Sequence, residues 1–145
     1  MTTRIATGLG PILAGLLAGV FAQAALAQTP RLTVELNKTE AGETDGCRAF
    51  FLFRNQTAKS FEGFEMSLAI LDTNGIIDRL LSIDAAPIPA GRTTLKLFEI
   101  EGIACDSISE FLLHEMPSCR PQNEAETDCF DLIDLQSRAA AQLVK

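Results

Sequence analysis

The chain contains no tryptophan, no tyrosine and a single histidine, His114. Without indole or phenol rings, stacking on sugars or bases would need phenylalanine alone, and the phenylalanines mostly stand in apolar strand patterns typical of a core. A serine or cysteine nucleophile would need His114 as its base, yet His114 follows Leu113 inside a strand pattern. The sequence has no Gly-x-Ser-x-Gly motif, the turn that exposes a serine nucleophile in many hydrolases. The sequence therefore predicts a protein that is not an enzyme and carries no cofactor.

Basic residues are also scarce. The 12 lysines and arginines face 19 aspartates and glutamates, which gives a net charge of −7. An acidic domain repels phosphate backbones and anionic lipid surfaces. We therefore expect no nucleic-acid partner, and no membrane contact once the leader is removed.

The longest apolar run lies at the N-terminal end. Arg4 is the only charge before the run Ile5–Ala25, and Ala25-Leu26-Ala27 matches a signal-peptidase site. A retained transmembrane anchor is the alternative, because the run is long enough to span a bilayer. The small residues favour cleavage after Ala27. The sequence thus predicts a signal peptide over 1–27, a periplasmic or secreted domain over 28–137, and a loosely held tail over 138–145.

A β-hairpin occupies the middle of the sequence. Apolar residues recur at every second position before Asp72-Thr73-Asn74-Gly75, which has the composition of a tight turn; they are Phe64, Met66, Leu68 and Ile70. A second apolar run, 76–83, follows the turn at once. The pattern predicts two antiparallel strands with one face of the first strand buried.

Further short strands are predicted on both sides of this hairpin, at 31–36, 47–54, 93–100, 107–116 and 129–135. The register of 93–100 stays open. In one alternative Leu95 lies inward, alone or with Thr93 and Leu97; in the other, Lys96 lies outward with Phe98 crossing the strand. The segment 107–116 could also begin a helix, and Pro117 is expected to end it in either case. The segment 129–135 is a strand or a helical turn. With polar or proline-containing loops at 37–46, 85–92 and 122–128, the pattern predicts an all-β, antiparallel, immunoglobulin-like sandwich of about seven strands.

Four cysteines in a small exported domain indicate two disulfides. If strands alternate in direction, Cys47 begins one strand at the end of the sandwich where the strand before Cys105 finishes. Cys119 and Cys129 flank a loop at the opposite end. We therefore predict the pairs Cys47–Cys105 and Cys119–Cys129. The cysteines are too far apart in sequence for a four-cysteine zinc site.

One metal-binding alternative involves His114 and Met116. Residues two apart on a strand share a face, so both side chains could bind a soft ion such as Cu(I). Met66 is the only further methionine after residue 27, and no second histidine exists. A copper carrier is accordingly the second hypothesis, after a binding module.

Residues 50–100 resemble a small exported immunoglobulin- or fibronectin-like module of the FxLYD type. The matching features are the phenylalanine-rich strand ending in Asn55, the 61–72 strand with its Asp72-x-x-Gly75 turn, and Ile88-Pro-Ala-Gly-Arg92 before a strand with Phe98. The four cysteines are similar to those of uncharacterised secreted proteins of alphaproteobacteria. Leu71 stands where a tyrosine is usual. The resemblance implies a binding or assembly role in the cell envelope, with a protein partner that could add to an exposed strand edge.

Overall fold

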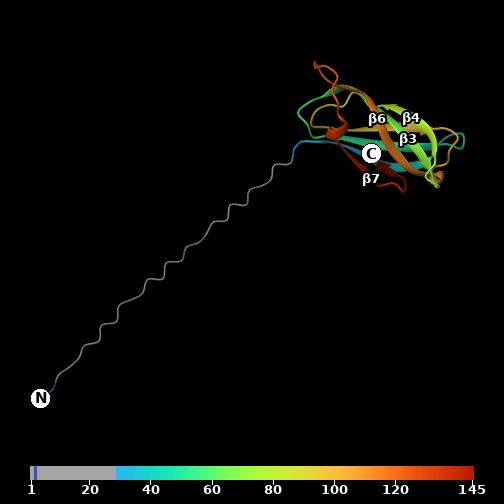
Figure 1. The fold of residues 1–145 in the computed structure, drawn as a ribbon, viewed down its shortest axis with the longest axis horizontal. Helices are drawn as coiled ribbons and strands as arrows, with labels where there is room; N and C mark the ends of the chain where they lie inside the picture. The colour runs from blue at the N-terminus through green and yellow to red at the C-terminus, as the bar shows by residue number, and fades with distance from the viewer. Residues whose placement is uncertain (1, 3–28) are drawn as a thin grey trace.

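The computed structural model describes residue 2 and residues 29–145, so the predicted signal peptide lies outside the described residues. These residues form two four-stranded sheets packed face to face (Figure 1). The strands are β1 (Leu32–Ala41), β2 (Cys47–Asn55), β3 (Phe61–Asp72), β4 (Ile77–Asp84), β5 (Thr93–Ile100), β6 (Ile108–Pro121), β7 (Ile133–Ser137) and β8 (Gln142–Val144). Short 3₁₀ helices, η1 (Cys105–Ser107) and η2 (Phe130–Leu132), precede β6 and β7.

The first sheet has the order β5-β2-β1-β7 and the second the order β4-β3-β6-β8. The predicted all-β sandwich is confirmed, as are both disulfides, Cys47–Cys105 and Cys119–Cys129. The sheets are mixed rather than wholly antiparallel, because β7 pairs with β1 and β8 pairs with β6 in parallel. Both parallel pairs lie along one flank, where β7 and β8 contact each other. Strands β4 and β5 therefore form the opposite flank.

Phenylalanines from both sheets fill the space between them. Phe51 packs edge-on against Phe111 of the other sheet at 6.1 Å between ring centroids, and Phe53 packs against Phe64 at 6.0 Å. The four alternating residues predicted to face inward on β3 are all fully buried; they are Phe64, Met66, Leu68 and Ile70. Edge-to-face ring pairs add to the stability that apolar burial provides.

The turn between β3 and β4 confirms the hairpin interpretation. Gly75 has a φ of 75°, which a residue without a Cβ adopts at little cost. The Asp72 carboxylate accepts the amides of Asn74 at 2.8 Å and Ile76 at 2.9 Å. These backbone hydrogen bonds, led by the one from Ile76, hold the pKa of Asp72 below its usual value despite some desolvation. The Asp72 carboxylate thus stabilises the turn.

Strand β1 is longer than predicted, because residues 37–41 continue it instead of forming a loop. A bulge at Asn37 shifts the pairing with β2, so that Leu36 is opposite Phe51 and Lys38 is opposite Phe50. The extra residue breaks the apolar alternation on which the prediction depended. Lys38 and Glu40 consequently lie on the outer face of the first sheet.

Pro117 does not end β6, which runs on to Pro121. Ser67 of β3 lies opposite Glu115 of β6, but Glu65, two residues earlier, lies opposite Ser118, three residues later. This register shift leaves Pro117 in an irregular stretch. A proline is tolerated at such a place because no ladder hydrogen bond is required of its nitrogen.

The segment predicted as a loosely held tail instead carries β8. Its Leu143 is buried against the core, and the Leu143 amide also donates to the Ser137 hydroxyl at 2.5 Å. The segment 129–135, left open between strand and helical turn, forms η2 and then the first residues of β7. No helix among the described residues is long and apolar enough to cross a membrane.

Candidate functional site

The outer face of the first sheet exposes apolar side chains where a solvated sheet would be polar. Leu97 lies opposite Phe50 and Leu95 lies opposite Leu52, so β2 and β5 form an apolar quartet. Leu95 is 59% exposed and Leu97 46% exposed. We call Phe50, Leu52, Leu95 and Leu97 the docking face. Clustered apolar side chains of this kind, rimmed by polar residues, mark interaction surfaces.

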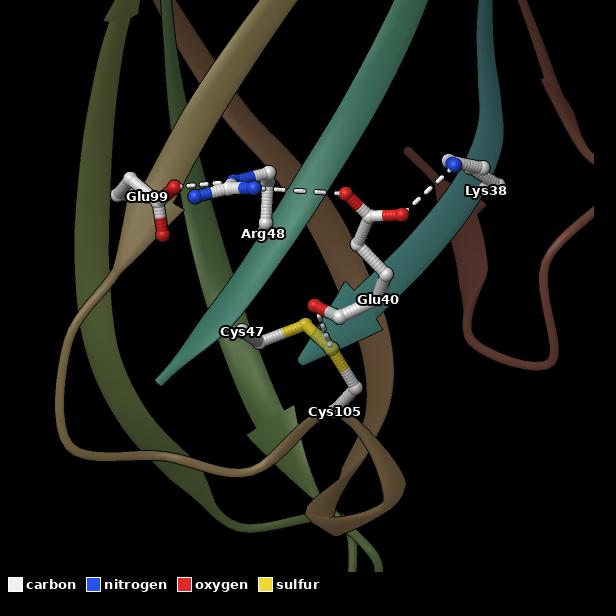
Figure 2. A network of polar contacts seen from close by, with 6 residues as sticks. All are labelled: Lys38, Glu40, Cys47, Arg48, Glu99 and Cys105. Carbon is white, nitrogen blue, oxygen red and sulfur yellow. Dashed lines mark hydrogen bonds and ion pairs between the residues drawn. A yellow bond between two sulfur atoms is a disulfide. The ribbon is translucent and has the colours of Figure 1, made fainter. Parts of the chain in front are cut away.

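A chain of charged residues borders the docking face at the end where the first disulfide lies. Figure 2 shows it crossing β1, β2 and β5 in the order Lys38, Glu40, Arg48 and Glu99. Lys38 Nζ lies 2.7 Å from Glu40 Oε2, Arg48 Nη1 lies 3.5 Å from Glu40 Oε1, and Arg48 Nε donates to Glu99 Oε1. Lys38 Nζ also lies 4.5 Å from the centre of the Phe50 ring. These contacts order the side chains around the apolar quartet.

The pairing in this chain shifts the ionisation of its members. The Lys38 ammonium, followed by Arg48, lowers the pKa of Glu40 in spite of some desolvation. The Glu99 carboxylate raises the pKa of Arg48. Both shifts favour the charged forms of Glu40 and Arg48, the two central members of the border.

A buried carboxylate lies beside the docking face, opposite Leu52. Glu35 of β1 is 1% exposed, and its Oε1 accepts the Asn37 amide at 2.7 Å. Arg54 Nη2 lies 3.4 Å and Arg138 Nε 3.3 Å from Glu35 Oε2. The Asn37 hydrogen bond, with the two arginines, outweighs desolvation and lowers the pKa of Glu35. Glu35 therefore joins the segment after β7 to the centre of the sheet.

We expect Glu35→Gln to lower the free energy of unfolding by about 1–3 kcal/mol at pH 7, because charge-assisted hydrogen bonds are lost. A carboxyl whose folded pKa is depressed contributes stability above its unfolded pKa, and that contribution is lost as pH falls through the folded pKa. The difference between wild type and variant should therefore be largest at neutral pH and shrink below about pH 4.5. Urea unfolding at several pH values measures it.

Glu43→Gln, in the exposed loop before β2, is the matched control and should have little effect. A Glu35→Gln effect that is the same at pH 3 and pH 7 would contradict the charged role of Glu35.

Two basic residues occupy inward-facing positions on the edge strands β5 and β4; they are Lys96 and Arg79. Lys96, opposite Phe51, donates to the Ala86 carbonyl at 3.1 Å. Arg79, opposite Ile70, donates to the Glu101 carbonyl at 2.7 Å. Inward-pointing charges at edge strands oppose the addition of another strand. On this flank, the exposed side chains of the sheets, rather than the edges of β4 and β5, are thus the accessible feature.

The disulfide Cys47–Cys105 stands directly under the charged border. Cys105 Sγ lies 3.1 Å from the Glu40 carbonyl oxygen, which is a contact and not a hydrogen bond, because a disulfide sulfur carries no hydrogen (Figure 2). Gly46 precedes Cys47 where a Cβ would stand 2.6 Å from the Ile100 carbonyl oxygen. The close backbone approach and the disulfide hold β1, β2 and β5 together at this end.

His114 and Met116 do not form an evident metal centre. His114 is exposed and lies 3.6 Å from Glu115, whereas Met116 is half-buried and packs against the core. The irregular pairing of β6 in this region removes the regular alternation that would give both residues one face. The described residues contain no cluster of three or more His, Cys, Asp or Glu side chains arranged to hold a metal ion. The copper hypothesis stays a prediction.

Comparison with models of protein families gives no match, and no curated protein matches the sequence. The solved structure of IrmA from Escherichia coli is similar in fold, with a TM-score of 0.57. The similarity covers 74% of this chain and 92% of that chain at 14% sequence identity. At this identity the likeness supports a β-sandwich domain and no more. The two disulfides are typical of proteins from oxidising, extracytoplasmic compartments.

Proposed function

We propose that this chain is an exported, non-enzymatic binding module that docks a protein partner on the docking face. The observation that supports the proposal is the apolar quartet on a sheet whose bordering charges are already paired with one another. Paired charges around an apolar centre resemble the rim and core of a protein interface. The resemblance to FxLYD-like envelope modules is consistent with this role, as is a periplasmic or secreted location.

The apolar centre is the source of affinity in this proposal. Burying Leu95 and Leu97 removes their exposed surface from water, and the neighbouring β2 residues provide a firm platform. Binding through the face also agrees with the inward charges at the strand edges, Lys96 and Arg79, which oppose the strand addition that the sequence alone left open.

Site-specific photocrosslinking in an exporting bacterial host tests the proposal. A p-benzoylphenylalanine residue at position 97 should give a discrete protein adduct, and the same residue at position 43 should not. Leu95→Asp in the position-97 protein should reduce the adduct about tenfold or more, because a carboxylate would be desolvated at the interface centre. The partner identified from the adduct is then titrated against purified wild type and Leu95→Asp protein.

The absence of an adduct from positions 50, 52, 95 and 97 would contradict the docking face. A purified protein that releases product from an envelope polymer without any partner would contradict the non-enzymatic assignment.

A further inference from the structure

The outer face of the second sheet carries a separate apolar row. Register places Leu80, Ala69, Leu112 and Val144 side by side across β4, β3, β6 and β8. Ile77 lies opposite Leu71 in the next row. Leu80 is 59% exposed and Ile77 is 58% exposed. The row therefore offers apolar surface on the opposite side of the sandwich from the docking face.

Within residues 29–145, carboxylates that make no ion pair with lysine or arginine flank this row. Glu110 lies in the row on one side, opposite Leu71, and Glu115 lies in the row on the other side, opposite Ser67. Glu65 and Asp84 lie opposite each other, one row farther on. Among the described residues, none of the four has a lysine or arginine nitrogen within 4.0 Å; Glu115 has only His114, at 3.6 Å. We call these residues, with the apolar row, the acid-rimmed face.

The two faces differ in how their charges are neutralised. On the first sheet, Glu35, Glu40 and Glu99 each contact an arginine of the same sheet or its extension. On the second sheet, Arg120 lies opposite Gly63 and pairs with Glu62 and Glu126 rather than with the acid-rimmed face. Among the described residues, no lysine or arginine pairs with the four carboxylates of this face, so its negative potential is directed outward. Because the binding of a cationic segment would bring opposite charges together around an apolar contact, the complement is a Lys- or Arg-bearing apolar surface.

We propose that the acid-rimmed face is a second docking surface, for a protein segment that presents apolar side chains between lysines or arginines. A second copy of this chain is a poor occupant through the same face, since two sets of unpaired carboxylates would repel. The docking face lies on the other sheet, so the module holds two partners at once. This second surface is independent of the function proposed above.

Heteronuclear NMR on the protein purified from an exporting host tests the surface, with a synthetic eight-residue peptide of alternating leucine and lysine as the probe. We expect amide shifts at positions 69, 80, 112 and 144, weaker binding in high salt, and little binding of the matched leucine–glutamate peptide.

Two matched double variants place the binding on one sheet. Leu80→Ser with Leu112→Ser should weaken binding of the lysine peptide tenfold or more, whereas Leu95→Ser with Leu97→Ser should leave it unchanged. Glu65→Lys with Glu110→Lys should weaken it as well and admit the glutamate peptide. Unfolding curves establish that each variant is folded before it is titrated.

Three results would overturn the proposal: shifts confined to the acidic loop 122–128 or the docking face, equal losses in both leucine double variants, or equal binding of the two peptides. A fourth result would also overturn it: peptide-free dilution that changes the same four amides would assign the face to self-association.

Discussion

Replacing Cys47 and Cys105 together with alanine is expected to lower the free energy of unfolding by about 4 kcal/mol. The bond closes a loop with a sequence separation of 58, and in the chain-entropy description a longer loop gives a larger restriction of the unfolded chain. The same bond fixes the first sheet where the charged border crosses it (Figure 2). Chemical unfolding of the oxidised wild type and the double variant measures the difference.

The second disulfide provides the comparison. Cys119 and Cys129 are separated by only 10 positions, so their replacement should cost about 3 kcal/mol. If the Cys119/Cys129 variant proves the less stable of the two, loop entropy is not the dominant contribution. Photocrosslinking from position 97 should also weaken in the Cys47/Cys105 variant, because β2, on which β5 is paired, loses its covalent tie to η1.

Alternation in the sequence predicts the inner faces well wherever only one face of a strand is apolar. Strand β3 is the clear case, since its alternate residues Phe64 and Met66 are fully buried. Cys47 and Cys105 could be paired from strand direction, because alternating strands bring the two cysteines to the same end of the sandwich, and their Cα atoms are 4.8 Å apart. These features depend on local periodicity and simple topology.

The candidate docking face could not be predicted in the same way. In β5, Leu95 and Leu97 point to one face of the strand, whereas Phe98 and Ile100 point to the other. Both faces therefore carry apolar residues, and the alternation does not indicate which face is buried. The structure places Leu95 and Leu97 outward, which excludes the alternative with Leu95 inward and settles a register that the sequence left open. The predicted disulfide could have indicated the buried face. Cys47 is buried opposite Ile100, so Ile100 and the alternate residues of β5 on its side face the core.

The arrangement of charges likewise depends on tertiary structure. A net charge of −7 predicts an acidic surface but not its distribution. The bulge at Asn37 brings Lys38 and Glu40 onto the outer face of the first sheet, where Arg48 joins Glu40 to Glu99. A shift of one residue in a strand moves every following side chain to the other face. The part of the charged border that Lys38 and Glu40 form therefore depends on one irregular residue pairing.

Phe51→Ala is expected to lower the free energy of unfolding by about 3–5 kcal/mol, as for other large-to-small changes in a packed core. The Phe51 ring is fully buried, and it lies 5.8 Å from the Phe98 ring and 6.1 Å from the Phe111 ring. Its removal would leave a cavity between the sheets. Denaturant unfolding, with the slope compared to that of wild type, measures the loss.

Phe50→Ala, at the preceding position on β2, is the matched control, because its ring lies on the docking face beneath Lys38. The half-exposed ring leaves no internal cavity, so its removal should cost less than half as much stability as the Phe51 change. It should nevertheless reduce the position-97 adduct, whereas Phe51→Ala at a temperature where it stays folded should not. Equal stability losses in the two variants would contradict the separation of core and binding surface across this strand.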